Sequence, residues 1–220
     1  MTDSKEETKK KEVLTVMLVL LGFAGVGKTA IATQYCNNFF PAKYEPTISD
    51  RYKKTVSLNK KRVDVHILDT AGQPAYSTLP EEHLQEGDGF MIIYGVDTQE
   101  SFEKAQELFD DLVEVRDEGD KCPVVLVANR TDIGRRVVTE AQGRDRLAAW
   151  QEAHPMDNKS KVVPLDYIEC TAKGNEHIAI CFDILTEALL SRAQDMGNDE
   201  EEDWRATVPQ VSWCAECGVM

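Results

Sequence analysis

The stretch GFAGVGKTA, residues 22–30, combines glycines, one lysine and one threonine at a spacing suited to binding phosphate. Glycines let backbone N–H groups turn toward phosphate oxygens, the lysine adds a positive charge, and the threonine hydroxyl can bind Mg²⁺. Residues 22–29 match G-x-x-x-x-G-K-[ST] and form a P-loop, set between an expected strand and an expected helix. A glycine-rich turn without a ligand is the weaker interpretation. The candidate phosphate-binding residues are Gly22, Ala24, Gly25, Val26, Gly27, Lys28, Thr29 and Ala30.

A second group of candidate residues ends another apolar run, in ILDTAGQ. Asp69 can hold a metal ion through water, Gly72 leaves a backbone N–H to contact a terminal phosphate, and Gln73 can orient a water molecule. By itself the tetrapeptide DTAG is a common exit from a strand. After a P-loop it becomes a specific signal for a nucleotide site.

A third group could select the base of that nucleotide. VLVANRTD ends an apolar run with Asn129 and Asp132, and a carboxylate can accept two N–H bonds from guanine that adenine does not offer. ECTAK, residues 169–173, would bring the N–H of Ala172 near the guanine carbonyl. Asn-x-x-Asp is also a common turn. Both motifs, however, follow expected strands, where doubly wound folds bind their ligands.

In this order, the motifs resemble those of the small GTPases of the Ras superfamily, and within it the Ras family. The similarity covers residues 13–195, and YEPTISD (44–50) is similar to the first switch of that family. The resemblance implies a switch that binds GTP or GDP with Mg²⁺, hydrolyses GTP slowly and signals from a membrane. It also implies effector proteins, a guanine-nucleotide exchange factor and a GTPase-activating protein as partners.

The resemblance also assigns roles to individual residues. Thr47 would complete the Mg²⁺ shell and contact the γ-phosphate, Phe40 would pack beside guanine, and Tyr44 would close over the phosphates. Catalysis would involve Gln73, Lys28 and Thr47, and the metal would be held by Thr29, Thr47 and Asp69. The base would be held by Phe40, Asn129, Arg130, Asp132, Thr171, Ala172 and Lys173.

Four residues depart from the family pattern. Ala24 replaces a P-loop glycine, Arg130 replaces the lysine of N-K-x-D, Thr171 replaces the serine of S-A-K, and Ser49 replaces an acidic residue. A planar guanidinium can stack where the lysine stem would lie, so we expect guanine binding with altered affinity. Ala24 favours an alternative, a module that holds GTP with little or no turnover. A P-loop nucleoside kinase or ATPase is a third interpretation, but it would not need Asp132 together with CTAK.

The last four residues, CGVM, fit the C-a-a-X lipidation signal. They predict a farnesyl group on Cys217, and Cys214 is placed for a second, reversible acyl chain. CAEC could instead be half of a zinc site or a redox pair, but the sequence has no second C-x-x-C. We therefore expect the protein at the cytoplasmic face of the plasma membrane, with a cytosolic pool.

The elements that must position these motifs alternate between strands and helices. Apolar or alternating runs predict strands at 13–21, 51–58, 62–69, 89–96, 122–129 and 165–170. The second and third runs are joined across Asn59, Lys60 and Lys61 as an expected hairpin, and helical patterns lie between the others. A capping box at Thr139 and Gln142 and an apolar stripe over 178–189 mark two of the helices. The pattern predicts an α/β P-loop NTPase fold, a six-stranded mostly parallel sheet flanked by about five helices. The prolines of 154–164 predict a surface loop there.

Length and composition limit the remaining possibilities. The chain has 220 residues, enough for one α/β domain at 13–195, with a charged flexible N-terminus at 1–12 and a flexible acidic tail at 196–220. A formal net charge of −14 argues against a nucleic-acid partner. The six cysteines are too scattered for a disulfide framework. We expect a monomer.

Overall fold

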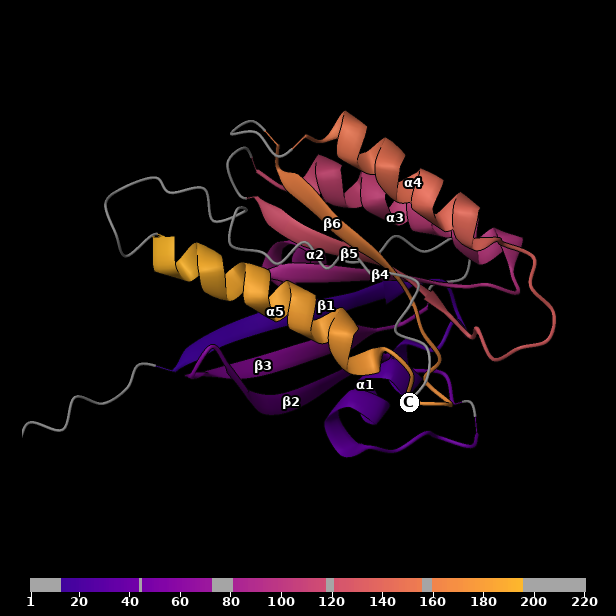
Figure 1. Cartoon of the computed structure of the whole chain (residues 1–220), viewed down its shortest axis with the longest axis horizontal. Helices are drawn as coiled ribbons and strands as arrows, with labels where there is room; N and C mark the ends of the chain where they lie inside the picture. Colours follow the sequence, from indigo (N-terminus) through magenta and orange to yellow (C-terminus); the bar gives the residue numbers. More distant parts are fainter. Residues whose placement is uncertain (1–12, 44, 73–80, 118–120, 156–159, 196–220) are drawn as a thin grey trace, which may run out of the picture.

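The computed structural model describes residues 13–43, 45–72, 81–117, 121–155 and 160–195. They form a six-stranded sheet in the order β2-β3-β1-β4-β5-β6, with helices on both faces (Figure 1). This is the P-loop NTPase fold that the sequence predicts. The strands are β1 (Leu14–Gly22), β2 (Ser49–Leu58), β3 (Lys61–Thr70), β4 (Gly89–Gly95), β5 (Cys122–Asn129) and β6 (Val162–Glu169). The helices are α1 (Lys28–Asn37), α2 (Glu81–Glu86), α3 (Gln99–Val115), α4 (Glu140–Ala153) and α5 (Ile178–Asp195).

All strand pairs are parallel except β2 with β3. These two strands form the predicted hairpin, with Leu58 paired to Lys61 across a two-residue turn. Asn59 and Lys60 both have positive φ, 48° and 62°, which gives the turn the twist that antiparallel strands require. The parallel strands all point in the same direction, so their carboxyl ends lie along one side of the sheet. The loops that follow β1, β3, β5 and β6 can therefore meet there.

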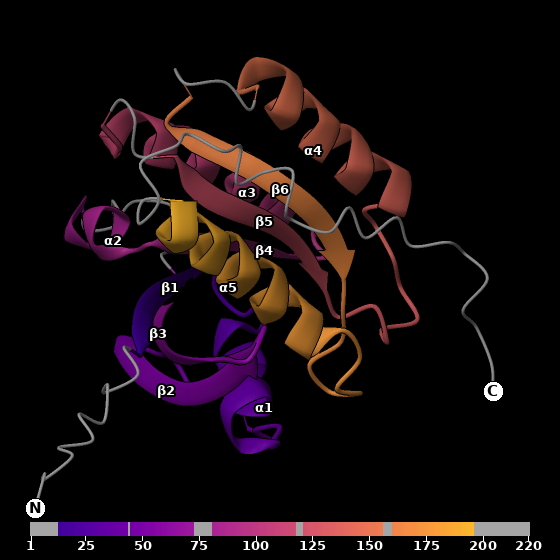
Figure 2. The same ribbon diagram turned by 60° about the vertical axis from the view of Figure 1, so that its left-hand side comes forward.

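Alternate residues of the central strands point into two separate apolar cores. Leu18 and Leu20 of β1 pack with α1 and α5, whereas Val19 and Leu21 pack with α2, α3 and α4. Figure 2 shows α5 on one side of the sheet and α3 and α4 on the other. Because both faces are covered, β1, β4 and β5 are continuous apolar runs rather than alternating ones.

The helix predictions that rested on local signals are confirmed. Thr139 caps α4 by accepting the N–H of Gln142, and the side chain of Gln142 accepts the N–H of Thr139. The predicted stripe on α5 is buried against the sheet, from Ile178 to Leu189.

The prediction of a loop over 154–164 is wrong at its end, because residues 162–164 begin β6. β6 lies at the edge of the sheet and pairs only with β5. An edge strand tolerates proline because one side of its backbone makes no ladder hydrogen bonds. The register with β5 shifts just after Pro164, between Val124 and Val125.

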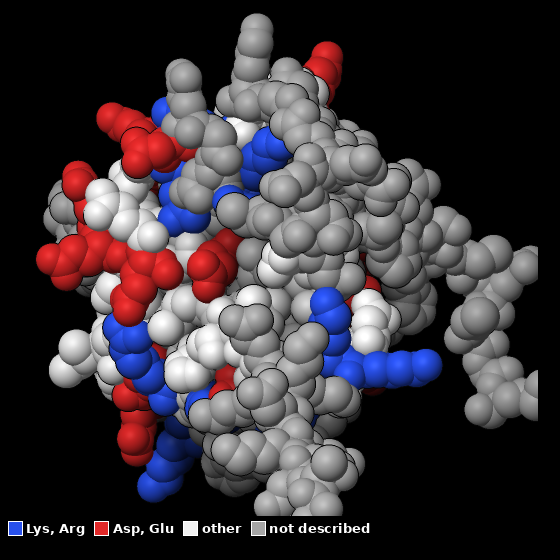
Figure 3. Space-filling view, turned by 90° about the vertical axis from the view of Figure 1, so that its left-hand side faces the viewer, with Lys and Arg blue, Asp and Glu red and all other residues white. Residues whose placement is uncertain are grey.

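The surface carries many charged side chains. On the face shown in Figure 3, acidic side chains gather along one side, with basic side chains between and below them. The outer side of α3 alone exposes Glu100, Glu103, Glu107, Asp110 and Glu114. Among the residues that the structure describes, no helix combines the length and apolarity needed to cross a bilayer.

Candidate functional site

A cavity of about 1290 Å³ opens where the loops after β1, β3, β5 and β6 meet. Residues 39–50 form its outer wall, except for Tyr44, which lies outside the described residues, as does Gln73. Most of the predicted site residues line this one cavity: Gly25, Gly27, Lys28, Thr29, Ala30, Phe40, Thr47, Gly72, Asn129, Arg130, Asp132, Thr171, Ala172 and Lys173. Gly22, Val26 and Asp69 are buried behind the wall, and Ala24 is half-buried.

The P-loop begins at the end of β1 and leads into α1, so the helix N-terminus points toward phosphate. Gly27 caps α1 with φ at 99°, and a side chain there would lie 2.4 Å from Nδ2 of Asn129. The Nζ of Lys28 donates to the carbonyl of Gly22 at 2.8 Å and to that of Phe23 at 3.0 Å. Burial lowers the pKa of Lys28 to about 8, although the charge of Asp69 opposes the shift. An anion bound in the cavity would favour the charged lysine.

Three oxygen-bearing side chains converge beside the P-loop. The hydroxyl of Thr29 donates to Oδ2 of Asp69 at 2.6 Å and lies 2.8 Å from the hydroxyl of Thr47. Because the Thr29 hydrogen is used for Asp69, Thr47 is the donor to Thr29. Thr47 comes from the loop before β2, and Asp69 comes from β3.

These residues fit a magnesium ion. Oδ1 of Asp69 is buried and has no hydrogen-bond partner among the described residues. Burial raises the pKa of Asp69 to about 6, against the hydrogen bond from Thr29 and the charge of Lys28. No cluster of three His, Cys, Asp or Glu side chains occurs in the described part of the chain. Hydroxyls with a single carboxylate suit a hard cation that keeps some of its water.

The P-loop also contacts the segment that follows β3. A side chain added to Gly72 would lie 2.3 Å from Cα of Ala24, 2.6 Å from its backbone nitrogen and 2.9 Å from Nζ of Lys28. Only glycine therefore fits at position 72 in this arrangement. The residue that departs from the family pattern, Ala24, is in contact with the start of the segment that leads to Gln73.

On the base side of the cavity, Asn129 joins three segments. Its Nδ2 donates to the carbonyl of Val26 at 2.8 Å, and its Oδ1 accepts the N–H of Ala172 at 3.2 Å. Asp132 is exposed to the cavity, and its Oδ1 accepts the hydroxyl of Thr171 at 2.7 Å. Asn129 thus orders the protein, whereas Asp132 offers a carboxylate to a ligand.

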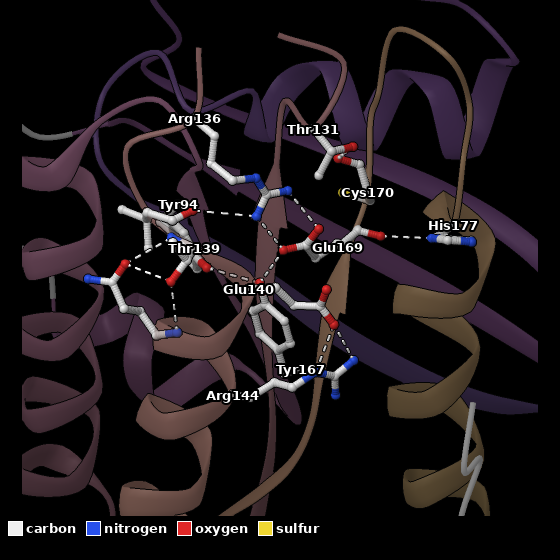
Figure 4. Close-up of polar contacts among 12 residues, drawn as sticks. Tyr94, Thr131, Arg136, Thr139, Glu140, Arg144, Tyr167, Glu169, Cys170 and His177 are labelled. Atoms are coloured by element: carbon white, nitrogen blue, oxygen red, sulfur yellow. Dashed lines mark hydrogen bonds and ion pairs between the residues drawn. The ribbon is translucent and has the colours of Figure 1, made fainter. Parts of the chain in front are cut away.

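The sequence did not reveal a polar network that holds the loops after β5 and β6 together (Figure 4). Glu169 accepts two hydrogen bonds from Arg136, at 2.7 and 2.8 Å, and one from the hydroxyl of Tyr167 at 2.7 Å. Although burial opposes it, these hydrogen bonds lower the pKa of Glu169. Nδ1 of His177 lies 2.8 Å from the Glu169 carbonyl, and Thr131 donates to the carbonyl of Cys170 at 3.0 Å. Because Glu169 belongs to the ECTAK motif, the sequence indicates that it lies near the site. No sequence spacing predicts that Arg136 is its partner.

Comparison with known proteins agrees with this geometry. A family model described as "Ras family" matches residues 17–191, most of the chain. The chain belongs to the Ras family. It is 31% identical over 188 residues to "Ras-related protein O-RAL" of Diplobatis ommata, which covers 84% of each chain. It is 30% identical over 190 residues to "Ras-related protein Ral-B" of Mus musculus, covering 86% of this chain and 84% of that one. With "Ras-like protein rasB" of Dictyostelium discoideum, identity is 33% over 186 residues, covering 84% and 87%.

As a member of the Ras family, the protein is a small GTPase, a GTP-binding switch that hydrolyses GTP. Membership implies binding of GTP, GDP and Mg²⁺, and partners of the exchange-factor, activating-protein and effector kinds. The cavity is the place in the described structure where the motifs of the family meet.

Proposed function

We propose that this GTPase signals from a membrane and that its GTP-bound and GDP-bound states differ around Thr47 and Gly72. The observation that carries the proposal is the convergence of Thr29, Thr47 and Asp69 beside the P-loop. Thr47 lies in a loop, and the residues next to it in the sequence are exposed, so few contacts hold Thr47 in this position. Loss of the γ-phosphate would remove a ligand from both segments and release them.

In the proposed complex, P-loop N–H groups and Lys28 bind the β- and γ-phosphates. Thr29, Thr47 and Asp69 would hold Mg²⁺, which neutralises phosphate charge when it is bound. The N–H of Gly72 would contact the γ-phosphate, because Gly72 already touches the P-loop. Asp132 would accept the ring and amino N–H groups of guanine, beside Ala172 and Lys173.

The proposed hydrolysis is an in-line attack by water. The water oxygen forms a bond to the γ-phosphorus, the bond from phosphorus to the β–γ bridging oxygen breaks, and GDP leaves with that electron pair. The water proton passes to the phosphate that is released. Lys28 stabilises charge that develops at the bridging oxygen, and Gln73 would orient the attacking water.

The alternative is a GTP-holding module with little turnover. The closeness of Gly72 to the Ala24 backbone supports it, because the residue that carries the extra methyl group of the P-loop lies beside the segment that leads to Gln73. Single-turnover hydrolysis of GTP on purified protein separates the two functions. We expect slow but measurable phosphate release that Gln73→Leu abolishes. If GTP stays bound and no phosphate is released, the protein is instead a GTP-holding module.

The tail supports the membrane part of the proposal. Cys214 and Cys217 lie outside the described residues, within the proposed acidic tail at 196–220. A farnesyl group on Cys217 with an acyl chain on Cys214 would place the domain at 13–195 on the cytoplasmic face of the plasma membrane. The GTPase would act there as a monomer. Effector proteins would bind the loop around Thr47 in the GTP-bound state and not in the GDP-bound state.

A further inference from the structure

Arg130 stands where the Ras family usually has lysine, at the end of β5. Its φ is 71°, so the backbone turns sharply there, and Arg130 is one of the residues that line the cavity. The side chain is 38% exposed. A long, half-exposed guanidinium has many rotamers, and binding a nucleotide against it requires that one of them be selected.

Asp97 supplies a contact that selects such a rotamer. Its Oδ2 lies 3.3 Å from Nη2 of Arg130, and the Asp97 side chain is only 18% exposed. Oδ1 of Asp97 is buried and has no hydrogen-bond partner among the described residues. Beside this ion pair, the carboxylate can therefore accept a hydrogen bond from the same guanidinium, which offers several donors in one plane.

The backbone that carries Asp97 is fixed to the strand end that carries Arg130. The N–H of Val96 donates to the carbonyl of Asn129 at 3.1 Å, and the N–H of Thr98 donates to Gly95 at 3.2 Å. The carbonyl of Val96 accepts from the N–H groups of residues 137 and 138, at 2.8 and 2.9 Å. Asp97 is thus held on a rigid turn beside the guanine motif.

Gly95, the last residue of β4, leaves room for the pair. A side chain there would lie 2.8 Å from Oδ1 of Asp97 and 3.5 Å from Cδ of Arg130. A side chain at position 95 would therefore displace the Asp97 carboxylate. Asp97 itself does not line the cavity, so it would act on a ligand only through Arg130.

We propose that Asp97 is a positioning residue for guanine-nucleotide binding, holding the Arg130 guanidinium flat against the wall where base and ribose lie. The inference rests on the proposed guanine site. The lysine of related proteins is a compact charge, whereas an arginine needs a partner that orients its plane. The pair Asp97–Arg130 compensates in this way for the departure from N-K-x-D.

The test measures dissociation of a fluorescent GDP analogue from the full chain with Mg²⁺ present, after adding excess GDP. Asp97→Asn removes the charge and keeps the shape, and we expect dissociation to be about fivefold to twentyfold faster, the range for a charge-assisted bond that is partly exposed. Arg130→Gln should also speed dissociation. In the double variant, Asp97→Asn should add little, because its partner is already absent.

The matched control is Asp64→Asn. Asp64 pairs with Lys53 at 2.7 Å on the hairpin of β2 and β3 and does not line the cavity. Its loss should leave the dissociation rate unchanged. Melting temperatures of all variants, measured with the same nucleotide, separate a loss of positioning from a general loss of stability.

Two results would overturn the inference and leave the proposed guanine site in place. An unchanged dissociation rate in Asp97→Asn would show that the carboxylate does not act on the nucleotide. Equal acceleration by Asp97→Asn in the unaltered chain and in the Arg130→Gln variant would show that it does not act through Arg130. Competition of the bound analogue by ATP as well as by GTP, in the unaltered protein, would overturn the guanine site and the inference together.

Discussion

Ala24 adds a methyl group to the P-loop, and the Ala24 backbone lies against Gly72 in the segment after β3. Phosphate binding through backbone N–H groups does not depend on this methyl group. In the proposed mechanism the transition state would depend on it, because Gln73 and an arginine inserted by an activating protein would share the space near the γ-phosphate. That arginine contributes about 10³- to 10⁵-fold in Ras itself, the protein for which the figure was obtained.

We therefore predict that Ala24→Gly raises the stimulated rate of GTP hydrolysis more than the intrinsic rate. The measurement is phosphate release with and without a Ras-type activating protein, for the unaltered chain and for Ala24→Gly. Nucleotide affinity should be the same in both proteins. Full acceleration of the unaltered chain, or equal rates for the two, would show that the methyl group is tolerated.

Asp132 is the proposed acceptor for the N–H groups of guanine. Replacing Asp132 by Asn should weaken GTP binding by about 2–4 kcal/mol, because buried donors of guanine lose a charged acceptor. The same change should favour xanthine nucleotides, whose C2 oxygen can accept from the Asn amide. Competition binding with GTP, XTP and ATP measures this shift. Asp145→Asn, on the exposed side of α4, is the control and should bind as before.

At the scale of elements, α4 packs on β6 through a glycine. A side chain on Gly143 would lie 2.3 Å from Cε2 of Tyr167. The Tyr167 ring has little freedom to move, since its hydroxyl donates to Glu169 at 2.7 Å and lies 3.2 Å from the hydroxyl of Tyr94. Close packing of α4 thus supports the network that holds the loops after β5 and β6 together.

Gly143→Ala should lower the melting temperature by about 2–6 °C. Overpacking costs about 1–3 kcal/mol, and the better helix propensity of alanine recovers up to about 1 kcal/mol of it. Thermal unfolding at a fixed GDP concentration measures the effect. Gly134→Ala is the matched control, because a side chain there would meet no atom within 4 Å. A more stable Gly143→Ala protein would mean that Tyr167 can move away without loss.

At the scale of the whole molecule, negative charge works against attachment to a membrane. The net charge is −14, and residues 199–203 are all acidic and close to the proposed anchor. Anionic lipids repel such a tail, and one prenyl chain alone binds only marginally. A second lipid on Cys214 would offset both effects.

We predict that Cys217→Ser makes the full chain wholly cytosolic. Cys214→Ser should keep the prenyl group but leave the plasma membrane for internal membranes or the cytosol. Imaging of a tagged chain together with membrane fractionation measures both distributions, and Ser212→Ala should behave as the unaltered protein. Cys217→Ser that stays at the plasma membrane would rule out the prenyl anchor.

The sequence alone determined the fold class, the family and most of the cavity. The P-loop, DTAGQ, NRTD and CTAK motifs are short and contiguous, and each follows an apolar run that predicts a buried strand. In a parallel sheet, the carboxyl ends of such strands lie side by side. That motifs far apart in the sequence meet there can therefore be predicted from the sequence alone. Local chemistry likewise fixed the α4 cap and the β2–β3 hairpin.

Only the tertiary structure revealed which side chains support those motifs. Asp97 meets Arg130, Arg136 meets Glu169, and Gly143 meets Tyr167, each pair across two different elements. The sequence pattern places Pro164 in a loop, whereas the structure places it in β6 at the edge of the sheet. Periodicity reports which face of an element is buried, but it carries no information about the neighbour on that face. Those neighbours are decided by the order of the strands and the packing of helices on them.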